Sequence, residues 1–423
     1  MELLLRKLCD LAVRGGRLEV ITARGTRFVA GDGPRDGPPP VAMRFTDKAA
    51  ERALVLFPEM KLGELITDGR LVIERGTIYD LLTLLMRGRP GGRGVWGSRL
   101  MRKLRRAALA VFARNDERRA RANVAHHYDL DHRLYDLFLD ADRQYSCAYF
   151  ETPRTNLEEA QLAKKRHVTA KLLVEPGHEV LDIGCGWGGL ALYLAGVAGA
   201  GRVRGVTLSE EQHRMAGERA RREGLASRVE IALQDYRHVT GDFDRIVSVG
   251  MFEHVGPAHY AEFFGTTARL LRQDGVMLLH TIGSTAEPGP TNPWITRYIF
   301  PGGHVPTLSE MIPAIERSGL QVADVEVLRL HYAQTLRAWR ERFLARREEA
   351  ARLLDERFCR MWEFYLASCE AAFRYEDLVV FQLQLTHRND VVPLTRDYVG
   401  ERERMLKGLE AGTTHREAER RTG

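Results

Sequence analysis

Short apolar runs alternate with longer amphipathic stretches over the second half of the chain, from about residue 160. Each run has the length of a buried strand, and the stretches between them mostly show helical periodicity. This alternation predicts an α/β domain with a doubly wound, largely parallel sheet. Five strands are expected: HEVLDIGC (178–185), RVRGVTLS (202–209), RVEIAL (228–233), FDRIVSVG (243–250) and GVMLLHTI (275–282).

Two later apolar runs, LQVADVEVLRL (320–330) and LVVFQLQLTH (378–387), would add strands at one edge and make a seven-stranded sheet. The helical region between them, which reaches about Phe373, is longer than a simple crossover requires. We expect these extra helices to form a roof over a long ligand.

The N-terminal part has a different pattern. Residues 1–86 contain short β-like runs around the Gly/Pro cluster GDGPRDGPPP (31–40) and end in a helical stretch, TIYDLLTLLMR (77–87). We predict a small α+β domain here, followed by a basic linker over 87–122. The catalytic domain is then expected over 123–398, and a charged, helical tail over 399–423.

Positive charge is concentrated in the linker. Residues 87–121 contain twelve Arg or Lys and two acidic residues, in a chain of net charge +6, so the remainder is slightly acidic. Residues 99–114 place apolar and basic side chains on different sides of a helix, which suits the surface of anionic lipid. A solvated helix packed on a neighbouring domain fits the same pattern.

The remaining composition excludes some classes. No apolar stretch approaches the roughly 18–20 residues needed to cross a bilayer, and MELLLRKLCD does not resemble a signal peptide. The five cysteines are widely spaced without a CxxC pair, so neither a zinc site nor a disulfide framework is expected. We therefore expect a cytoplasmic protein whose contact with membranes is peripheral.

A glycine-rich turn follows the first expected strand, in VLDIGCGWGGL (180–190). Glycines at a strand-to-helix turn let the backbone approach a ligand closely. The acidic residue before the turn favours a cofactor with a cationic amino acid end over one with a pyrophosphate. Together with an acidic residue after the third strand, placed to accept from an adenine amino group, this pattern indicates S-adenosylmethionine. The candidate contacts are Asp182, Gly184, Gly186, Thr207, Ser209, Gln212, Asp235 and Tyr236.

Eight segments occur in order over roughly residues 123–345: HYDL (127–130), YSCAYF (145–150), LDIGCGWGG (181–189), GVTLSEEQ (205–212), MFEHVG (251–256), LLHTIG (278–283), YIFPGG (298–303) and HYAQTLRAW (331–339). In these segments the sequence closely resembles the cyclopropane-fatty-acyl-phospholipid synthase family, which includes the mycolic acid cyclopropane synthases. The resemblance implies a class I, Rossmann-like methyltransferase fold. It also implies methylene transfer from S-adenosylmethionine to the cis double bond of a phospholipid acyl chain, giving a cyclopropane ring. In longer family members the N-terminal domain is associated with lipid binding and with homodimer formation.

The expected chemistry requires a protected base. Methyl transfer to an alkene leaves a carbocation, and a base must remove a proton from it while water is excluded. The resemblance implies that this base is a bound bicarbonate and that Tyr145 and Ser146 contact the cofactor. The implied bicarbonate ligands are Cys147, Glu253, His280, Tyr332 and the backbone of Ile282. Taken singly, these side chains would more often be a buried thiol, a helix-start acid, a core histidine and a packed aromatic.

Three alternatives stay open. A relative could methylate the same olefin without closing the ring, and sequence separates this activity poorly from cyclopropanation. A nucleic acid methyltransferase is suggested by the pI of 9.1, but GMFEHVG stands where [ND]PP[YF] would be expected, and we predict no nucleic acid partner. A lipid carrier without catalysis would not need the glycine turn and the bicarbonate set together.

Overall fold

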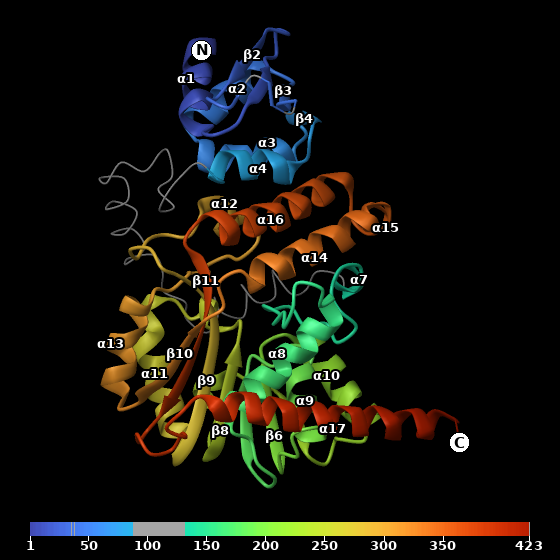
Figure 1. Ribbon diagram of the computed structural model, residues 1–423, viewed down its shortest axis with the longest axis vertical. Helices are drawn as coiled ribbons and strands as arrows, with labels where there is room; N and C mark the ends of the chain where they lie inside the picture. Colours follow the sequence, from blue (N-terminus) through green and yellow to red (C-terminus); the bar gives the residue numbers. More distant parts are fainter. Residues whose placement is uncertain (35, 38, 88–131, 423) are drawn as a thin grey trace.

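The computed structural model describes residues 1–34, 36–37, 39–87 and 132–422, with side chains up to residue 412. Within these residues the chain forms an N-terminal unit and a larger unit built on a seven-stranded sheet (Figure 1). The helix expected over 99–114 lies outside the described residues.

The N-terminal unit is a four-stranded sheet with the strand order β2-β1-β3-β4, covered by helices. Its sheet is mixed, because β1 pairs antiparallel with β2 and parallel with β3. In chain order its elements are α1 (Glu2–Ala12), β1 (Leu18–Ile21), β2 (Arg27–Ala30), β3 (Val41–Phe45), α2 (Lys48–Leu56), α3 (Pro58–Thr67), β4 (Leu71–Arg75) and α4 (Ile78–Arg87).

All seven strands expected in the larger unit are present, in the order β10-β11-β9-β8-β5-β6-β7. They are β5 (Glu179–Ile183), β6 (Arg202–Thr207), β7 (Val229–Leu233), β8 (Phe243–Val249), β9 (Leu271–Ser284), β10 (Gln321–Val327) and β11 (Leu378–Thr386). The first five are parallel, whereas β11 pairs antiparallel with both β9 and β10. Two strands at one edge were expected, and these are β10 and β11.

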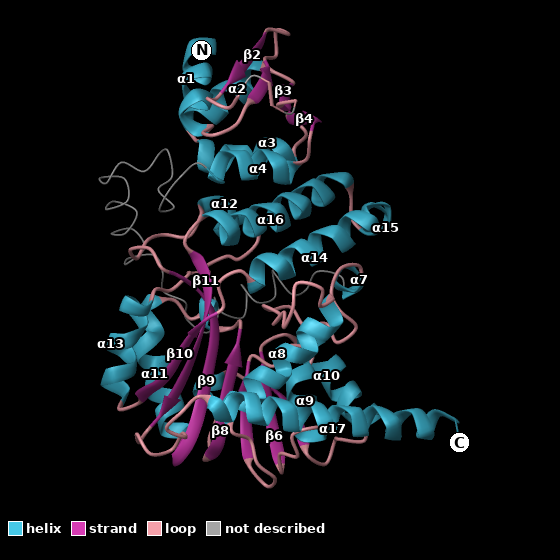
Figure 2. Ribbon diagram, viewed as in Figure 1, coloured by secondary structure: helices cyan, strands magenta, loops and turns pink. Residues whose placement is uncertain are grey.

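Helices cover both faces of this sheet (Figure 2). Because side chains alternate along a strand, β5 places Leu181 and Ile183 in one core and Val180 in the other. Helices α11 (Tyr260–Leu270) and α13 (Leu308–Ser318) cover the first face. The second face is covered by α8 (Leu157–Leu172), α9 (Gly189–Gly196) and α10 (Glu210–Arg222).

Helix α8 is unusual because its buried side is polar. Gln161, Lys164, His167 and Lys171 are all buried there, at spacings of three or four residues that place them along one side of the helix. A buried charge is stable only when it is paired or hydrogen-bonded, so each of these side chains must have a partner in the sheet or the nearby loops.

The roof expected from the sequence lies between the N-terminal unit and the sheet (Figure 1). It consists of α12 (Pro293–Tyr298), α14 (His331–Ala345), α15 (Arg347–Leu353) and α16 (Glu356–Tyr375). Helix α16 packs against α3 and α4 of the N-terminal unit. Helix α12 also meets α3, so closely that a Cβ on Gly63 would lie 2.5 Å from Nε1 of Trp294.

Two short segments complete the fold: α7 (His132–Asp136) and α17 (Asp397–Thr422). Helix α17 packs along α8, where Arg166 forms an ion pair with Glu410. The boundary expected at residue 398 therefore falls inside a helix that belongs to the larger unit. In the part of the chain that the structure describes, no helix is both long and apolar enough to span a bilayer.

Candidate active site

The glycine-rich turn lies at the carboxyl end of β5. Gly184 has φ +80°, and a Cβ there would lie 2.8 Å from the Cβ of Met251. Gly188, also at φ +80°, is the N-cap of α9. The turn, including Gly186, lines a cavity together with Leu208, Gln212, Asp235 and Tyr236. We refer to it as the cofactor cavity, because the expected cofactor contacts lie here. Glycine is therefore required at position 184, where the turn passes close to Met251 and to the cavity.

Asp182, before the turn, points into this cavity with an unsatisfied oxygen. Its side chain is buried, and Oδ2 has no hydrogen-bond partner among the described residues. Burial raises the pKa of Asp182 to about 7, although Lys164 acts to lower it. A buried carboxylate oxygen without a donor fits a ligand that brings a cationic amino group.

The polar residues after β6 divide into two roles. Thr207 and Gln212 line the cavity and are joined by a hydrogen bond of 2.9 Å from Thr207 Oγ1 to Gln212 Oε1. Ser209 does not line it. Instead, Ser209 Oγ accepts from the Gln212 N–H and forms the N-cap of α10. Ser209 therefore caps α10 in this structure, and its expected contact with the cofactor stays a prediction.

Asp235 follows β7 and lines the cavity beside Tyr236. It caps a short 3₁₀ helix and also accepts from Arg237, with Nε–Oδ1 and Nη2–Oδ2 distances of 2.9 and 2.7 Å. These contacts hold the pKa of Asp235 below its usual value, against the effect of burial. The carboxylate is therefore charged and fixed in orientation. Its Oδ1 accepts from both the backbone N–H and Nε of Arg237, whereas Oδ2 keeps one lone pair that can accept from a ligand.

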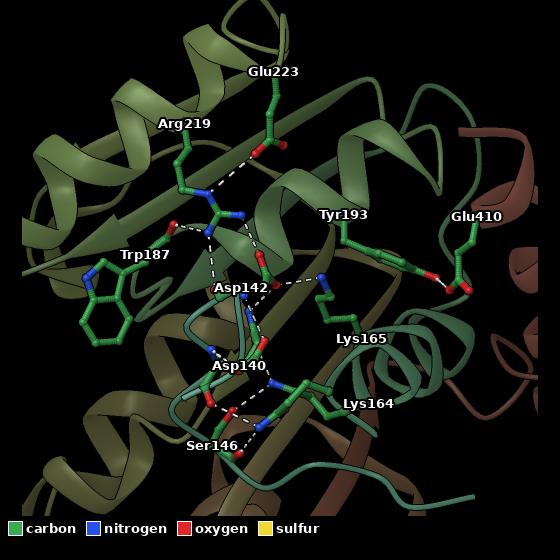
Figure 3. A network of polar contacts seen from close by, with 12 residues as sticks. Asp140, Asp142, Ser146, Lys164, Lys165, Trp187, Tyr193, Arg219, Glu223 and Glu410 are labelled. Atoms are coloured by element: carbon green, nitrogen blue, oxygen red, sulfur yellow. Dashed lines mark hydrogen bonds and ion pairs between the residues drawn. The ribbon is translucent and has the colours of Figure 1, made fainter. Parts of the chain in front are cut away.

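The segment that contains Tyr145 and Ser146 is held by cations of α8 (Figure 3). Lys164 Nζ donates to Ser146 Oγ over 2.8 Å and also to Gln144 Oε1. Burial lowers the pKa of Lys164 to about 8. Nearby, Asp142 accepts from Lys165 and from Arg219 of α10. The segment is thus joined to α8 and α10.

A second, larger cavity of about 900 Å³ contains all five expected bicarbonate ligands in its wall: Cys147, Glu253, His280, Ile282 and Tyr332. It shares Tyr145, Ser146, Gly250 and His254 with the cofactor cavity. Its far wall belongs to the N-terminal unit and is largely apolar, with Leu8, Leu18, Met43, Leu54, Leu81 and Leu82. This cavity therefore extends from the expected reaction centre into the core of the N-terminal unit.

Glu253 is held by one oxygen only. Its Oε1 accepts from the backbone N–H of Ile282 over 2.6 Å, while its Oε2 is buried and has no hydrogen-bond partner among the described residues. Burial raises the pKa of Glu253 to about 7, although the Ile282 N–H acts against this. The Ile282 N–H, expected to contact bicarbonate directly, donates to Glu253 in this structure.

His280 lies within β9, four residues before the strand ends, and is buried. Its Nδ1 is 3.1 Å from Nε2 of Gln382 on the neighbouring strand. Burial, reinforced by the cations of Lys164 and Lys171, holds the pKa of His280 well below its usual value. The ring is therefore neutral at physiological pH.

Cys147 and Tyr332 complete the set. Burial raises the pKa of the Cys147 thiol, so the thiol stays protonated and serves as a weak donor. Tyr332 is the second residue of α14 and packs edge-on against Trp339, with ring centroids 5.8 Å apart. Aromatic packing thus orients the phenol at the cavity wall.

Sequence reasoning missed three contributors: Lys164, Gln382 and the N-terminal unit's share of the large cavity. Lys164 lies within an apparently ordinary helix. The available signal was its spacing of seven residues from Lys171, two helical turns, which places both cations on one side of the helix. The partnership of Gln382 with His280 depends on the pairing of two strands about 100 residues apart, which no local pattern reveals.

Comparisons with known proteins show the family of the chain. The family model described as mycolic acid cyclopropane synthetase matches residues 115–383. The cyclopropane-fatty-acyl-phospholipid synthase of Escherichia coli (strain K12) is 46% identical over 280 residues, which cover 66% of this chain and 72% of that protein. The tuberculostearic acid methyltransferase UfaA1 of Mycobacterium tuberculosis is 43% identical over 279 residues, 63% of this chain and 65% of that protein.

Solved structures match as well. The mycolic acid cyclopropane synthase CmaA1, crystallised with SAH and CTAB, is 34% identical and superposes with a TM-score of 0.60. The match covers 63% of this chain and 97% of that one. The expected class I methyltransferase fold and the expected family are both confirmed. The chain belongs to the mycolic acid cyclopropane synthetase family of S-adenosylmethionine-dependent methyltransferases.

Proposed function

We propose that this enzyme transfers a one-carbon unit from S-adenosylmethionine to the cis double bond of an unsaturated phospholipid acyl chain and closes a cyclopropane ring. The observation that carries the proposal is the junction of the two cavities. The cofactor cavity is lined by the glycine turn, and the large cavity is lined by the five expected bicarbonate ligands. The residues shared by the two cavities are Tyr145, Ser146, Gly250 and His254. A methyl donor in the first and an alkene in the second would meet at this junction.

The first cavity fits S-adenosylmethionine, which when bound supplies an electrophilic methyl group. The unpartnered Oδ2 of Asp182 suits a cationic amino group, and Asp235 has acceptor capacity for an adenine amino group. Thr207 and Gln212 offer further polar contacts on the same wall. Lys164 keeps Ser146 in place at the junction.

The second cavity fits a small oxyanion base held by several donors. The residues that would hold bicarbonate are Cys147, Glu253, His280 and Tyr332; the ion would there supply the base that accepts the proton lost before ring closure. Unlike its partner oxygen, Glu253 Oε2 has no donor among the described residues, so a protonated oxyanion could donate to it. Neutral His280 and the phenol of Tyr332 can donate in return.

The protein's own contribution is to orient the chain and exclude water. The alkene attacks the methyl carbon, the carbon–sulfur bond breaks, and the acyl chain carries the positive charge until a C–H bond breaks and the ring closes. Tyr145, Tyr332 and Phe373 line the cavity around this centre, and aromatic faces stabilise nearby positive charge. A dry wall protects the cation from water.

The N-terminal unit supports a long lipid as the substrate. The cavity of about 900 Å³ lies at the upper end of the range for ligand sites, about 300–1,000 Å³. Its apolar extension past Leu81 and Leu82 suits the hydrocarbon remote from the double bond. We propose that the chain enters from a membrane to which the enzyme binds peripherally, a step that sedimentation with phospholipid vesicles would test.

Methylation without ring closure is the second candidate, favoured by the similarity to UfaA1 and to a probable fatty acid methyltransferase of Pseudomonas putida, which is 42% identical over 268 residues. Product analysis separates the two. The enzyme is incubated with S-adenosylmethionine, bicarbonate and vesicles of a monounsaturated phospholipid, and the acyl chains are recovered. A gain of one CH₂ that resists mild hydrogenation supports cyclopropanation. A gain of one CH₂ that takes up hydrogen indicates a methyl-substituted alkene and supports the alternative, and no gain in mass contradicts both.

A further inference from the structure

Three side chains form a row across the sheet behind the large cavity. Strand pairing places Gln382 of β11 opposite His280 of β9 on one side and opposite Glu326 of β10 on the other. Directly opposed residues in antiparallel strands project from the same face, so these side chains are neighbours. The face is the one that α8 covers.

Lys171 of α8 lies over this row and contacts two of its members. Its Nζ donates to Gln382 Oε1 over 2.8 Å and forms an ion pair with Glu326. The Lys171 side chain is only 2% exposed. His167, one turn earlier on α8, contacts Glu326 through Nε2 and Glu403 of α17 through Nδ1, both at 2.7 Å. The ammonium group is therefore fixed by an ion-pair network that reaches from the sheet to the last helix.

The contact with Lys171 determines which way the Gln382 amide faces. An ammonium group can only donate, so the atom of Gln382 that it contacts must be the carbonyl oxygen. The amide NH₂ then faces His280 and donates to Nδ1, 3.1 Å away. Because Nδ1 accepts, the single proton of the neutral ring must be on Nε2.

We propose that Gln382 and Lys171 are positioning residues that hold His280 in its Nε2–H tautomer, so that the ring presents a hydrogen-bond donor to the large cavity. The proposal rests on the proposed function, because a donor is what an oxyanion base in that cavity requires. In the other tautomer, Nε2 would present a lone pair to the same anion and repel it. At metal sites, removing a residue that orients a ligating histidine from behind typically lowers activity about 10–100-fold, and we expect an effect of the same order here.

Gln382→Glu separates this role from a structural one. A carboxylate at this position keeps, and strengthens, the contact with Lys171, so a purely structural role predicts a folded and active variant. It also accepts from His280 in place of donating, and so draws the proton from Nε2 to Nδ1. We expect kcat to fall about 10–100-fold, with the Kd for S-adenosylmethionine unchanged.

The tautomer is read directly by ¹⁵N NMR of the full-length enzyme labelled at histidine. The His280 signals are those absent from His280→Gln, and in the parent enzyme Nε2 should be the protonated nitrogen. In Gln382→Glu the protonated nitrogen should become Nδ1. This measurement needs no substrate, so it can fail or succeed independently of the proposed reaction, which the product analysis tests.

Gln384→Glu is the matched control. Gln384 is buried on the same strand and face, two residues from Gln382, but donates to the Lys171 carbonyl and accepts from Tyr398. This variant should lose stability while the His280 tautomer and kcat stay as in the parent. Equal losses of kcat in both variants, or an Nε2–H tautomer that persists in Gln382→Glu, would overturn the proposal. If Gln382→Glu does not fold, Gln382→Met serves instead. It removes the donor to Nδ1 of His280, so we expect a mixture of the two His280 tautomers. A signal from the Nε2–H tautomer alone would overturn the proposal.

Discussion

Replacing Glu253 by Gln should lower kcat by orders of magnitude and, above neutral pH, make the protein more stable. Gln has the same shape, and its carbonyl can still accept from the Ile282 N–H that Glu253 Oε1 now binds. What is lost is the acceptor at the Oε2 position, which has no donor among the described residues and which we assign to the bound base. Cofactor affinity should be kept, because Glu253 lines the large cavity and not the cofactor cavity.

The size of the expected fall in kcat follows from the role of Glu253 in holding the base. Positioned acid–base groups typically contribute about 10²–10⁴-fold to rate, and we expect kcat to fall by that factor. The assay measures S-adenosylhomocysteine release with monounsaturated vesicles, and calorimetric titration gives the Kd for S-adenosylmethionine. A matching loss of cofactor affinity would refute the assignment of Glu253 to the acyl side.

The magnitude for stability follows from the pKa. The pKa of Glu253 rises from 4.5 in a model compound to about 7 in the fold, chiefly through burial. Between these values the folded chain binds more protons than the unfolded chain, so the free energy of unfolding falls as pH rises. At about 1.4 kcal/mol per pH unit, the carboxylate destabilises the fold by up to about 3 kcal/mol above pH 7.

Glu253→Gln removes this effect. Relative to the parent enzyme, the variant should therefore gain up to about 3 kcal/mol in free energy of unfolding between pH 5 and pH 8.5, measured by urea titration without bicarbonate. Glu316→Gln, at an exposed position of α13, is the control and should show no such pH-dependent gain. If the difference between Glu253→Gln and the parent does not change with pH, the carboxyl group is not buried as described.

Two further variants test the two cavities. Asp182→Asn should raise the Kd for S-adenosylmethionine about 10–100-fold, because hydrogen bonds to charged groups contribute about 1.5–3 kcal/mol. An unchanged Kd in calorimetric titration would contradict the contact between Asp182 and the cofactor. Leu82→Trp should reduce turnover of long acyl chains while cofactor affinity is kept, because Leu82 lines the apolar extension. Leu5→Trp overpacks the same unit away from the cavity wall, so equal loss of turnover in both variants would show that the effect is general destabilisation.

Much of the fold could be predicted from the sequence, because local patterns of apolar and polar residues determine the strands and helices. Each of the seven strands contains a run that could be located from the sequence, and so could the contiguous glycine turn, although β9 extends over Leu271–Ser284, beyond the expected 275–282. The contacts of single residues were less accessible. Asp235 was expected to face a ligand, yet it also binds Arg237 two residues away, and Ser209 caps a helix.

Long-range pairing was beyond sequence reasoning. The buried cations of α8 look like the solvated face of an ordinary helix until β10, β11 and the loop with Ser146 supply their partners. Likewise, the apolar residues of α4 look like the core of a separate small domain, whereas part of that core is the wall of a shared cavity. The hypothesis of a lipid-binding helix over 99–114 stays a prediction, since it lies outside the described residues.

The contact between Gly63 and Trp294 has a consequence for engineering and for divergence of the two units. A side chain at position 63 would enter the space of the indole, so the surfaces of α3 and α12 can change only in concert. An N-terminal unit exchanged with that of a relative would therefore be accepted only if it carries glycine at this position or if Trp294 is replaced by a smaller residue. During divergence of the family, substitutions at position 63 and at position 294 should therefore occur together.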